Sequence, residues 1–464
     1  MLHLLSNLTQ NKRGNSLLFI LVFGSLATMI ITTGVAAYAL FEHRASNRVH
    51  ARDMAFHIAE AGISYYRWHL AHNPNDFTDG TGEPGPYIHE YADKDGNTIG
   101  YFSLEIDEPL VGSTVATIRS TGWVDWMPES TRTIQIRTGF PALADYTFLS
   151  NANMNFSFTT EVHGQIHSNG GIRFDGTTDS WVRSARETYT YENQTHNGVW
   201  GGGGPRDFWQ FPVPAIDFNA ITADVGAIQT ASNEPEGIHF NSSGDEGWHF
   251  VFEGETFDVY RVTDVDCYNG SGRWRFNRWQ GWYWDGTTYC YDIGAETFIE
   301  TRNIPENGSI FVEDAVWVEG VINGRVTLGV GSFPVQQPYH PIYISGNITY
   351  TEQGGDDVLG LITQGDIIVP YQVPDDMTIH AAMLSQFGLI NRPYYDEDLK
   401  NSLTIFGSQI SYSGGGWKYV NGWGNVISGF EDTFHTYDAN LKYYPPPGFP
   451  VGDTYELISW EELE

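Results

Sequence analysis

The feature that most constrains the fold is an uncharged apolar segment close to the start of the chain. From Ser16 to Leu40 the sequence is rich in Leu, Ile, Val and Phe and contains no charged side chain. An apolar helix of about 20 residues is long enough to cross the hydrocarbon core of a membrane. We therefore expect Ser16–Leu40 to lie in a lipid bilayer as a single-pass transmembrane helix.

The helical pattern continues beyond the apolar segment. From Phe41 to His72 the sequence contains no Pro and a single Gly, and apolar residues recur at steps of three and four. This spacing predicts an amphipathic helix, which Pro74 ends. Ser16–His72 thus predicts one helix about 85 Å long at 1.5 Å per residue. A cleaved secretory signal has a shorter apolar core, of about 7–15 residues, and does not continue in this way.

The distribution of charge predicts which part of the chain is exported. Lys12 and Arg13 precede the apolar segment, and basic residues are typical of the cytoplasmic side of a membrane helix. The first 73 residues hold six basic and three acidic residues, so the remainder has 24 − 6 = 18 basic and 57 − 3 = 54 acidic residues, a net charge of −36. Nucleic acids are bound chiefly through Lys and Arg, so this surface argues against a nucleic-acid partner.

Two short stretches resemble a known family. Lys12-Arg13-Gly14 before the apolar run, and Ala55-Phe-His-Ile-Ala-Glu-Ala-Gly62 after it, resemble the N-terminal region of PilX-type pilus-assembly proteins and type IV minor pilins. The resemblance implies a cytoplasmic leader, residues 1–14, cleaved by a prepilin peptidase between Gly14 and Asn15, and a pilin-like helix, residues 15–73. It also implies that this helix packs against other pilin-like subunits. An ordinary single-pass anchor is the alternative.

One position departs from the pattern of major pilins. The fifth residue after the implied cleavage site is Phe19, where major pilins have a glutamate that pairs with a neighbouring N-terminus. Some minor and initiating subunits also lack this acid. The resemblance therefore favours a minor or initiating subunit over a major one.

Residues 74–140 predict a small antiparallel β domain. A connector rich in Pro, Gly and Asp is followed by runs typical of short strands; they are Tyr87–Tyr91, Ile99–Asp107, Val115–Ser120 and Arg132–Thr138. Asp93–Asn97 begins like a calcium loop, but Thr98 and Leu104 stand where such a loop needs Gly and Glu. We expect a hairpin turn there.

Residues 141–440 predict a β-solenoid. Very short aliphatic strands alternate with Gly and Asn, as expected where each coil stacks its inward side chains on the next; a β-sandwich is the alternative. Val162–Phe174 loosely resembles a segment of uncharacterised bacterial β-solenoid envelope proteins that carry the same N-terminal helix. We expect an insertion at about 190–300, no helix after Leu70, and in residues 441–464 an extended tail with a final strand, Tyr455–Trp460.

The predicted fold class is therefore mainly β with one long N-terminal α-helix. A pilin-like helix and a small antiparallel sheet precede a right-handed parallel β-helix-like (solenoid) domain.

The cysteines and tryptophans supply two candidate sites. Cys267 and Cys290 are the only cysteines, and strand-like stretches that face each other would allow a disulfide, which suits an oxidising compartment. Two unrelated buried thiols are the alternative. Between them, Trp279, Trp282 and Trp284 predict an aromatic surface for glycans or protein, with hairpin core packing as the alternative.

The sequence offers no catalytic residues, metal ligands or cofactor motif. Glycosidases need two carboxylates at a defined separation, and candidate acids are Asp175, Asp179, Asp356, Asp357, Asp366, Asp375 and Asp376. The motifs that accompany paired Asp in pectinase-like hydrolases do not occur. His163 and His167 would supply half a metal site if they lay on one strand. Calcium suits so acidic a protein outside the cytoplasm, but no motif locates a site.

Together with the resemblance, these patterns imply a non-enzymatic, membrane-anchored surface protein. The implied role is a minor-pilin or pseudopilin-like subunit for pilus assembly or adhesion, with a cytoplasmic N-terminus and an extracytoplasmic head. The expected partners are the bilayer, other pilin-like subunits and surface glycans. The alternatives are a membrane-tethered polysaccharide hydrolase or lyase and a carbohydrate-binding module.

Overall fold

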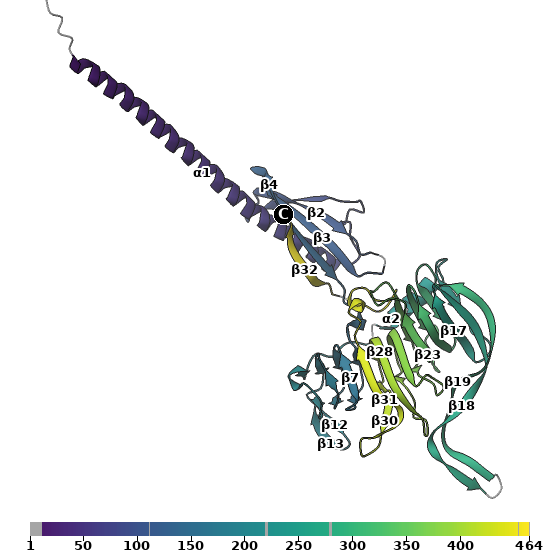
Figure 1. Ribbon diagram of the computed structural model, residues 1–464. Helices are drawn as coiled ribbons and strands as arrows, with labels where there is room; N and C mark the ends of the chain where they lie inside the picture. Colours follow the sequence, from purple (N-terminus) through teal and green to yellow (C-terminus); the bar gives the residue numbers. More distant parts are fainter. Residues whose placement is uncertain (1–11, 111, 219–220, 278–280, 453, 464) are drawn as a thin grey trace, which may run out of the picture. The chain divides into compact units, whose positions relative to one another are not determined.

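The computed structural model describes residues 12–110, 112–218, 221–277, 281–452 and 454–463, and of residues 12–15, 221–224, 276–277 and 281–282 it describes the backbone alone. The chain divides into two compact units (Figure 1). The first consists of residues 1–108, 116–138 and 457–464, and the second of residues 109–115 and 139–456.

A single long helix, α1, begins the described chain. It runs from Lys12 to His72, so the predicted helix Ser16–His72 is confirmed. The backbone turns away directly after it, where the amide of Asn73 still donates to the carbonyl of His69 at 2.8 Å. Pro74 follows, and a proline has no amide hydrogen with which to continue the helix.

The last part of α1 packs on a five-stranded sheet of order β1-β2-β3-β4-β32. Its strands are β1 (Tyr87–Ala92), β2 (Thr98–Asp107), β3 (Val115–Val124), β4 (Met127–Gly139) and β32 (Glu456–Leu463). The pairs β1–β2 and β2–β3 are antiparallel. Side chains of β3 alternate between buried and half-buried, as expected of a sheet with one face on the core. The first four strands confirm the sequence prediction, and Asp93–Asn97 forms the expected hairpin turn.

The second unit is built from many short strands. Those before its helix are β5 (Phe148–Ser150), β6 (Met154–Phe156), β7 (Thr160–His163), β8 (Ile166–Ser168), β9 (Ile172–Phe174), β10 (Thr177–Thr178), β11 (Val182–Ser184), β12 (Thr188–Tyr191), β13 (Gln194–Asn197), β14 (Val199–Trp200) and β15 (Trp209–Gln210). Helix α2 (Ile221–Ser232) precedes β16 (Ile238–Phe240), β17 (Gly247–Gly254), β18 (Thr256–Asn277), β19 (Gly281–Asn303), β20 (Ser309–Val312), β21 (Val316–Ile322), β22 (Arg325–Val330), β23 (Ile342–Tyr350) and β24 (Val358–Thr363). The remaining strands are β25 (Ile367–Ile368), β26 (Asp376–Ser385), β27 (Ile390–Asn391), β28 (Leu399–Ser411), β29 (Gly415–Gly416), β30 (Lys418–Val420) and β31 (Val426–Thr436), with 3-10 turns η1 (Leu143–Asp145), η2 (Arg206–Phe208) and η3 (Ala439–Lys442).

Most of these strands pair in three parallel ladders. The first ladder runs β20-β22-β24-β26-β28-β5-β8-β11. The second runs β17-β21-β23-β25-β27-β29. The third joins the later half of β23 to the early residues of β26 and then runs β28-β31-β7-β10. Parallel pairing of strands that are close in the sequence is what stacked coils require.

Aliphatic side chains from successive strands meet inside the ladders. Members of this core include Val326, Leu328, Leu359, Leu361, Ile379, Leu403 and Ile405. The predicted fold class is confirmed in its architecture: one long N-terminal helix, a small antiparallel sheet and a large parallel-rich sheet. The right-handed winding of a β-helix stays a prediction.

Helix α2 corrects one sequence prediction. We expected no helix after Leu70, and that was wrong. Val225 and Ile228, three residues apart, are fully buried in a cluster that includes Phe311 and Phe449. The segment mixes three Ala, which favour a helix, with Thr, Gly and Ser, which are weak helix formers, so local propensity alone does not decide its structure. Tertiary packing of one apolar face stabilises α2, and such packing is invisible in local sequence.

His163 and His167, which a metal half-site would need on one strand, lie in two strands, β7 and β8, with a turn between them. Gly164 at the turn has φ of +118°, a conformation that favours glycine. A Cβ at this position would lie 2.3 Å from the hydroxyl oxygen of Thr147. The chain therefore changes direction at Gly164, and the two strands belong to different ladders.

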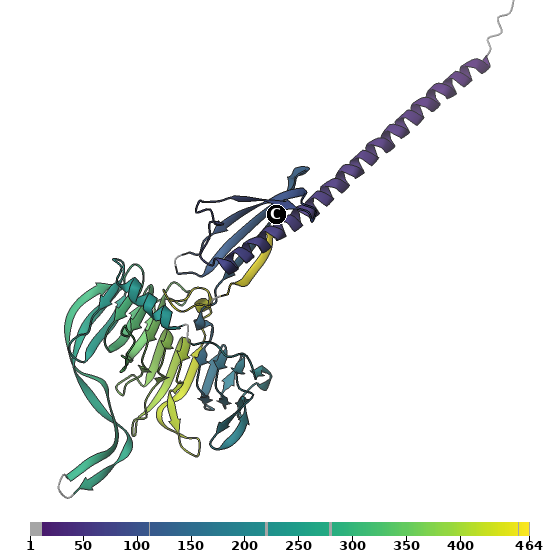
Figure 2. The same cartoon turned by 180° about the vertical axis from the view of Figure 1, so that it is seen from behind.

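The segment expected as an insertion contains both stacked and projecting strands. β16 and β17 pair in parallel with β20 and β21, so they extend the stack. β18 and β19 form a long antiparallel hairpin. Figures 1 and 2 both show the far end of this hairpin extending beyond the stacked strands.

Candidate functional site

The first half of α1 exposes large apolar side chains in every direction. Leu17, Ile20 and Met29 are 65%, 73% and 70% exposed. In the most apolar window of the helix the mean hydropathy is 2.2 and no residue is buried. Soluble domains rarely leave an apolar surface of this extent in water. By length and composition, Ser16–His72 is a helix that can cross a membrane.

The few polar side chains in this half bond to the helix itself. The hydroxyl of Thr28 donates to the carbonyl of Gly24 at 2.7 Å, and that of Thr33 to the carbonyl of Met29 at 2.6 Å. Ser25 donates to the carbonyl of Val22 at 2.9 Å. A polar group in hydrocarbon must find its partner within the protein, and these hydroxyls do so within one turn. The surface that this half of α1 offers to its surroundings is therefore apolar.

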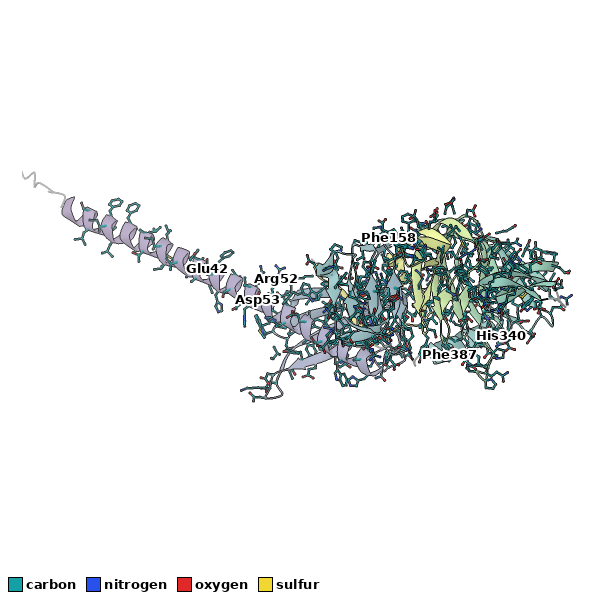
Figure 3. The ribbon with its side chains drawn as sticks, turned by 90° about the horizontal axis from the view of Figure 1, so that it is seen from below. Glu42, Arg52, Asp53, Phe158, His340 and Phe387 are labelled. Atoms are coloured by element: carbon teal, nitrogen blue, oxygen red, sulfur yellow. A yellow bond between two sulfur atoms is a disulfide. The ribbon has the colours of Figure 1, made fainter. Side chains whose placement is uncertain are left out.

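After the apolar segment, charged residues occur again. Glu42 is the first, and Figure 3 shows it with Arg52 and Asp53 further along the helix. From Ala51 onward one face of α1 is buried. Its members recur at steps of three and four; they are Ala51, Ala55, Ile58, Ala59, Ile63, Tyr66 and Leu70.

The small residues of this face let helix and sheet approach closely. A Cβ added at Gly122 of β3 would lie 2.3 Å from the carbonyl oxygen of Ala55 and 2.5 Å from the amide nitrogen of Ala59. A Cβ at Gly62 of α1 would lie 2.3 Å from the hydroxyl oxygen of Ser120. The Ala55–Gly62 motif thus has a physical role, since only small residues fit where the helix backbone meets β3.

Strand β32 completes the sheet beside α1. Its Trp460 packs edge-on against Phe56 of the helix, with ring centroids 6.1 Å apart. The guanidinium of Arg132 lies 5.8 Å from the Phe56 ring and forms an ion pair with Glu462 of β32. The predicted final strand therefore ties the end of the chain to the helix, a contact that its local sequence does not indicate.

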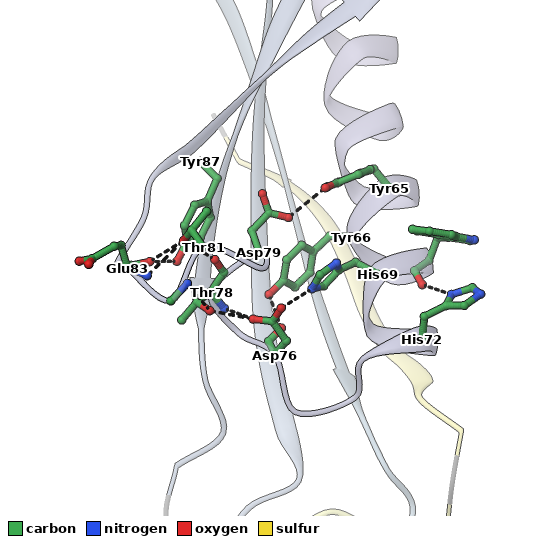
Figure 4. Close-up of polar contacts among 12 residues, drawn as sticks. Tyr65, Tyr66, His69, His72, Asp76, Thr78, Asp79, Thr81, Glu83 and Tyr87 are labelled. Carbon is green, nitrogen blue, oxygen red and sulfur yellow. Dashed lines mark hydrogen bonds and ion pairs between the residues drawn. The ribbon is translucent and has the colours of Figure 1, made fainter.

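A polar cluster fixes the C-terminal end of α1 (Figure 4). The ring of His69 is 3.0 Å from the Asp76 carboxylate, and the hydroxyl of Tyr66 donates to the carbonyl of Asp76 at 2.9 Å. The hydroxyl of Tyr65 donates to Asp79 at 3.1 Å, and the same carboxylate is 2.7 Å from His89 of β1. The loop after the helix is therefore bonded both to α1 and to the sheet.

The pKa values of two side chains in this cluster are shifted by their contacts. The hydroxyl and then the amide of Thr78 donate to Asp76, and these bonds lower the pKa of the Asp76 carboxyl. Partial burial, followed by the charge of Asp79, raises the pKa of Tyr65. These bonds hold the end of α1, the loop after it and the five-stranded sheet together.

The predicted processing residues lie in the first turn of α1. Gly14 and Asn15 have helical backbone, and their side chains lie outside the described part. Phe19 is 59% exposed and stacks on Phe23 with centroids 5.8 Å apart. The cleavage between Gly14 and Asn15 stays a prediction.

The cysteines and the aromatic residues lie on the long hairpin. Cys267 of β18 and Cys290 of β19 are directly opposite each other and joined by a disulfide. Trp284 packs edge-on against Trp274, which is 58% exposed. Trp279, and the side chain of Trp282, lie outside the described residues. The glycan- or protein-binding surface stays a prediction.

Six of the seven candidate acids bond to turns and neighbouring side chains, and the seventh, Asp356, is exposed. Asp357 accepts from the amides of Gly324 at 2.7 Å and Glu352 at 2.8 Å, and Asp366 accepts from the amide of Leu389 at 2.9 Å. Those with basic or hydroxyl partners pair as follows: Asp175 with Arg173, Asp179 with His163, Asp375 with Lys400, and Asp376 with Ser402.

His163 and His167 do not form a shared site. His163 ends β7 and lies 2.7 Å from Asp179, the contact that most raises its pKa. His167 is buried in β8, and burial lowers its pKa. Within the part of the chain that the structure describes, no group of three His, Cys, Asp or Glu side chains is arranged to hold a metal ion.

Comparisons with known proteins give little further information. No protein-family model and no curated protein matches the chain. The crystal structure of the competence-associated pilin ComZ from Thermus thermophilus aligns with 89% of this chain and 97% of its own, at 13% identity and a TM-score of 0.30. A TM-score this low carries no weight for fold or function, so the chain's own residues must supply the reasons.

Proposed function

We propose that the chain is a membrane-anchored, pilin-like envelope subunit whose α1 helix serves both as membrane span and as assembly surface. The observation that carries this proposal is the division of one continuous helix. Its first half is apolar and exposed all round, and its second half is packed on a small sheet. A soluble protein gains nothing from such a helix, whereas a subunit that moves between a bilayer and a helical bundle needs it.

The orientation follows from charge and length. Lys12 and Arg13 favour the cytoplasmic side, and the acidic remainder of the chain lies on the other side of the membrane. Arg44 and Arg48 weaken the asymmetry but do not reverse it, because the long exported part supports the same orientation. The disulfide between Cys267 and Cys290 is consistent with an oxidising compartment.

The exposed half of α1 fits two environments with the same chemistry. In the membrane its apolar side chains face lipid, and in a filament they face the apolar helices of neighbouring subunits. The lack of an acid at Phe19 favours a minor or initiating subunit. We propose that a prepilin peptidase cleaves after Gly14, that the protein joins such filaments, and that its head contributes to assembly or adhesion.

We propose a non-enzymatic role for the head. Six of the seven candidate carboxylates bond to backbone amides, to basic side chains or, for Asp376, to the hydroxyl of Ser402, as described above. A glycosidase needs two carboxylates facing a sugar across a defined gap, and bonds of this kind would hold them away from it. The head therefore acts through its surface and its attachment to α1.

Processing is tested on the native protein by mass spectrometry of its N-terminus. We expect Asn15 as the first residue, and retention of Met1 in a Gly14→Val variant. A native protein that starts at Met1 would remove the processing step and leave a plain anchor. Assembly is tested by shearing cells and looking for the protein in the filament fraction, where a Gly14→Val variant should be missing.

A further inference from the structure

The stack of strands has a break where the strands before α2 meet the last strands, β28–β31. We call this place the seam. The first and third ladders continue through this seam, since β28 pairs with β5 and β31 pairs with β7. The second ladder ends at β29, which pairs with β27. On the other side of the seam β6 belongs to a separate three-stranded sheet with β9 and β14. Two sides of the stack are thus joined at the seam, while the third side has a gap between β29 and β6.

This gap opens into a cavity of about 230 Å³. Its wall is rich in rings and aliphatic side chains, which belong to Phe148, Leu149, Met154, Phe156, Phe158, Ile390, Trp417 and Val420. The rings of Phe148 and Phe156 meet edge to face, 5.0 Å apart. Ligand sites are typically concave and mostly apolar, with a few placed polar groups. The volume suits a molecule built around one or two rings.

Most polar groups in the wall are already paired with each other. The amide oxygen of Gln409 accepts from the indole N–H of Trp417 at 3.0 Å, and its amide nitrogen is 3.1 Å from the ring of His435. The hydroxyl of Thr433 donates to Thr160 at 3.1 Å. Complete burial lowers the pKa of His435 to about 3, so this ring is neutral. This part of the wall is fixed and uncharged.

Lys418 is the exception. Its ammonium group donates to the hydroxyl oxygen of Thr159 at 2.6 Å and to the carbonyl of Glu431 at 2.8 Å, so one of its three hydrogens is left over. Within the described chain no carboxylate lies within ion-pair distance of it. The other cation of the wall, Arg173, is neutralised by Asp175 at 2.8 Å. The cavity therefore carries one positive charge without an ion-pair partner among the described residues, in a protein whose net charge is −33.

We propose that the seam cavity binds a small molecule with an apolar ring body and one carboxylate, which pairs with Lys418. The ring body lies against Phe148, Phe156 and Trp417. The carboxylate accepts the remaining Lys418 hydrogen and supplies an ion-pair partner, and such charge-assisted bonds are the strong ones. Phe158 and Val420, 62% and 47% exposed, flank the mouth. Figure 3 shows Phe158 on the surface beside the last strands.

The charge on Lys418 makes binding depend on pH. Burial lowers the pKa of Lys418 to about 8, against the opposing influence of Asp432 and then Glu431 of β31. The other ionisable groups nearby are neutral or paired: His435 of β31 is neutral, Arg173 of β9 is paired with Asp175, and Glu161 of β7 is 2.9 Å from His163. The carboxylate is bound while Lys418 is protonated, so affinity falls as the pH rises through the pKa of the lysine.

The test uses the full chain in micelles of an uncharged maltoside detergent and two probes of equal shape. Indole-3-acetate has the carboxylate, and indole-3-acetamide has an uncharged amide in its place. Equilibrium dialysis should give a dissociation constant at least about tenfold lower for the acetate, as one charge-assisted bond implies. Lys418→Gln should abolish this difference. The control Lys400→Gln, which removes a lysine bonded to Asp375 outside the cavity, should preserve it.

A second variant tests the place of binding. Among the described residues nothing lies within 4 Å of the position that a Cβ would take at Gly416, which lines the cavity, so Gly416→Leu should fill the space without strain. It should weaken binding of both probes. The preference for the acetate should be present at about pH 6.5 and should disappear as the pH rises to about 9.5. Equal affinity for the two probes, a preference that survives in Lys418→Gln, or no binding of either probe at millimolar concentration would each overturn the proposal.

Discussion

Two aspartates in the middle of the apolar half of α1 should expel this helix from the membrane. Leu26 and Ile30 are one turn apart on the exposed surface, 52% and 64% exposed, so Leu26→Asp/Ile30→Asp changes neither the helix core nor the head. At the centre of a span each substitution replaces a residue worth about −0.3 to −0.6 kcal/mol with one that costs about 2.5 to 3.5 kcal/mol. The double variant therefore costs about 6–8 kcal/mol.

This cost is comparable to or larger than what the span contributes. Its favourable residues are the Leu, Ile, Val and Phe residues, which are Leu17, Leu18, Phe19, Ile20, Leu21, Val22, Phe23, Leu26, Ile30, Ile31, Val35 and Leu40. On the same scale they sum to about −4 to −7 kcal/mol, so the net free energy of insertion becomes close to zero or unfavourable.

The assay is alkaline carbonate extraction of membranes, followed by immunoblotting of pellet and supernatant. The native chain should stay in the pellet and the double variant should not. Ser46→Asp/Val49→Asp is the matched control, because it adds the same charge on exposed positions of the same helix beyond the apolar segment. Aspartates also have little influence on orientation. A double variant that stays in the pellet, or a control that leaves it, would refute the reasoning.

Three further outcomes test the packed half of α1, its junction with the head, and the hairpin. Gly122→Ala should lower the free energy of unfolding by about 1–3 kcal/mol, because its Cβ would overlap the helix backbone, while Gly422→Ala, with open space around it, should change little in the same thermal melts. At neutral pH, Asp76→Asn should lower the free energy of unfolding by about 1 kcal/mol. Because the folded-state pKa of the Asp76 carboxyl is lowered, this contribution is present above about pH 4 and is lost as the pH falls through the folded pKa. Thermal melts of the two proteins should therefore converge in acid. Cys267→Ser should speed proteolysis within 256–303 under oxidising conditions while carbonate extraction stays unchanged, because the disulfide constrains this hairpin and not α1; equal cleavage of both proteins would contradict that role.

The sequence predicts those parts of the fold that depend on local pattern. The helix ends at His72 as expected, because Pro74 and the turn formers after it act locally. The hairpin at Asp93–Asn97 was predictable for the same reason, since its side chains bond to its own backbone: Asp93 accepts from the amides of Asp95 at 2.8 Å and Asn97 at 2.9 Å.

The parts that were missed depend on distant partners. Helix α2 is stabilised by the packing of Val225 and Ile228 against Phe311 and Phe449, far along the chain, and its own residues mix strong and weak helix formers. The place of β32 is set by Trp460 and Glu462, which meet Phe56 and Arg132. The close approach at Gly122 could have been suspected only from the small residues facing it on α1.

The same distinction holds for the candidate sites. The apolar segment could be recognised from composition alone, because crossing a bilayer requires only length and hydrophobicity. The seam cavity could not, since it arises where β29 and β6 fail to continue one ladder. Phe148 and Phe156 are far along the sequence from Trp417 and Lys418, and no motif joins them.

The central claim is that α1 holds one end of the chain in an apolar environment and carries the rest across the membrane. Cysteine labelling of intact cells tests it most directly, because the two native cysteines are joined in a disulfide. Trp423 is 91% exposed on the head and Ile30 lies in the apolar half of α1. A maleimide that does not cross the cytoplasmic membrane should label Trp423→Cys and leave Ile30→Cys unlabelled. Labelling of Trp423→Cys only after lysis of that membrane would contradict the account.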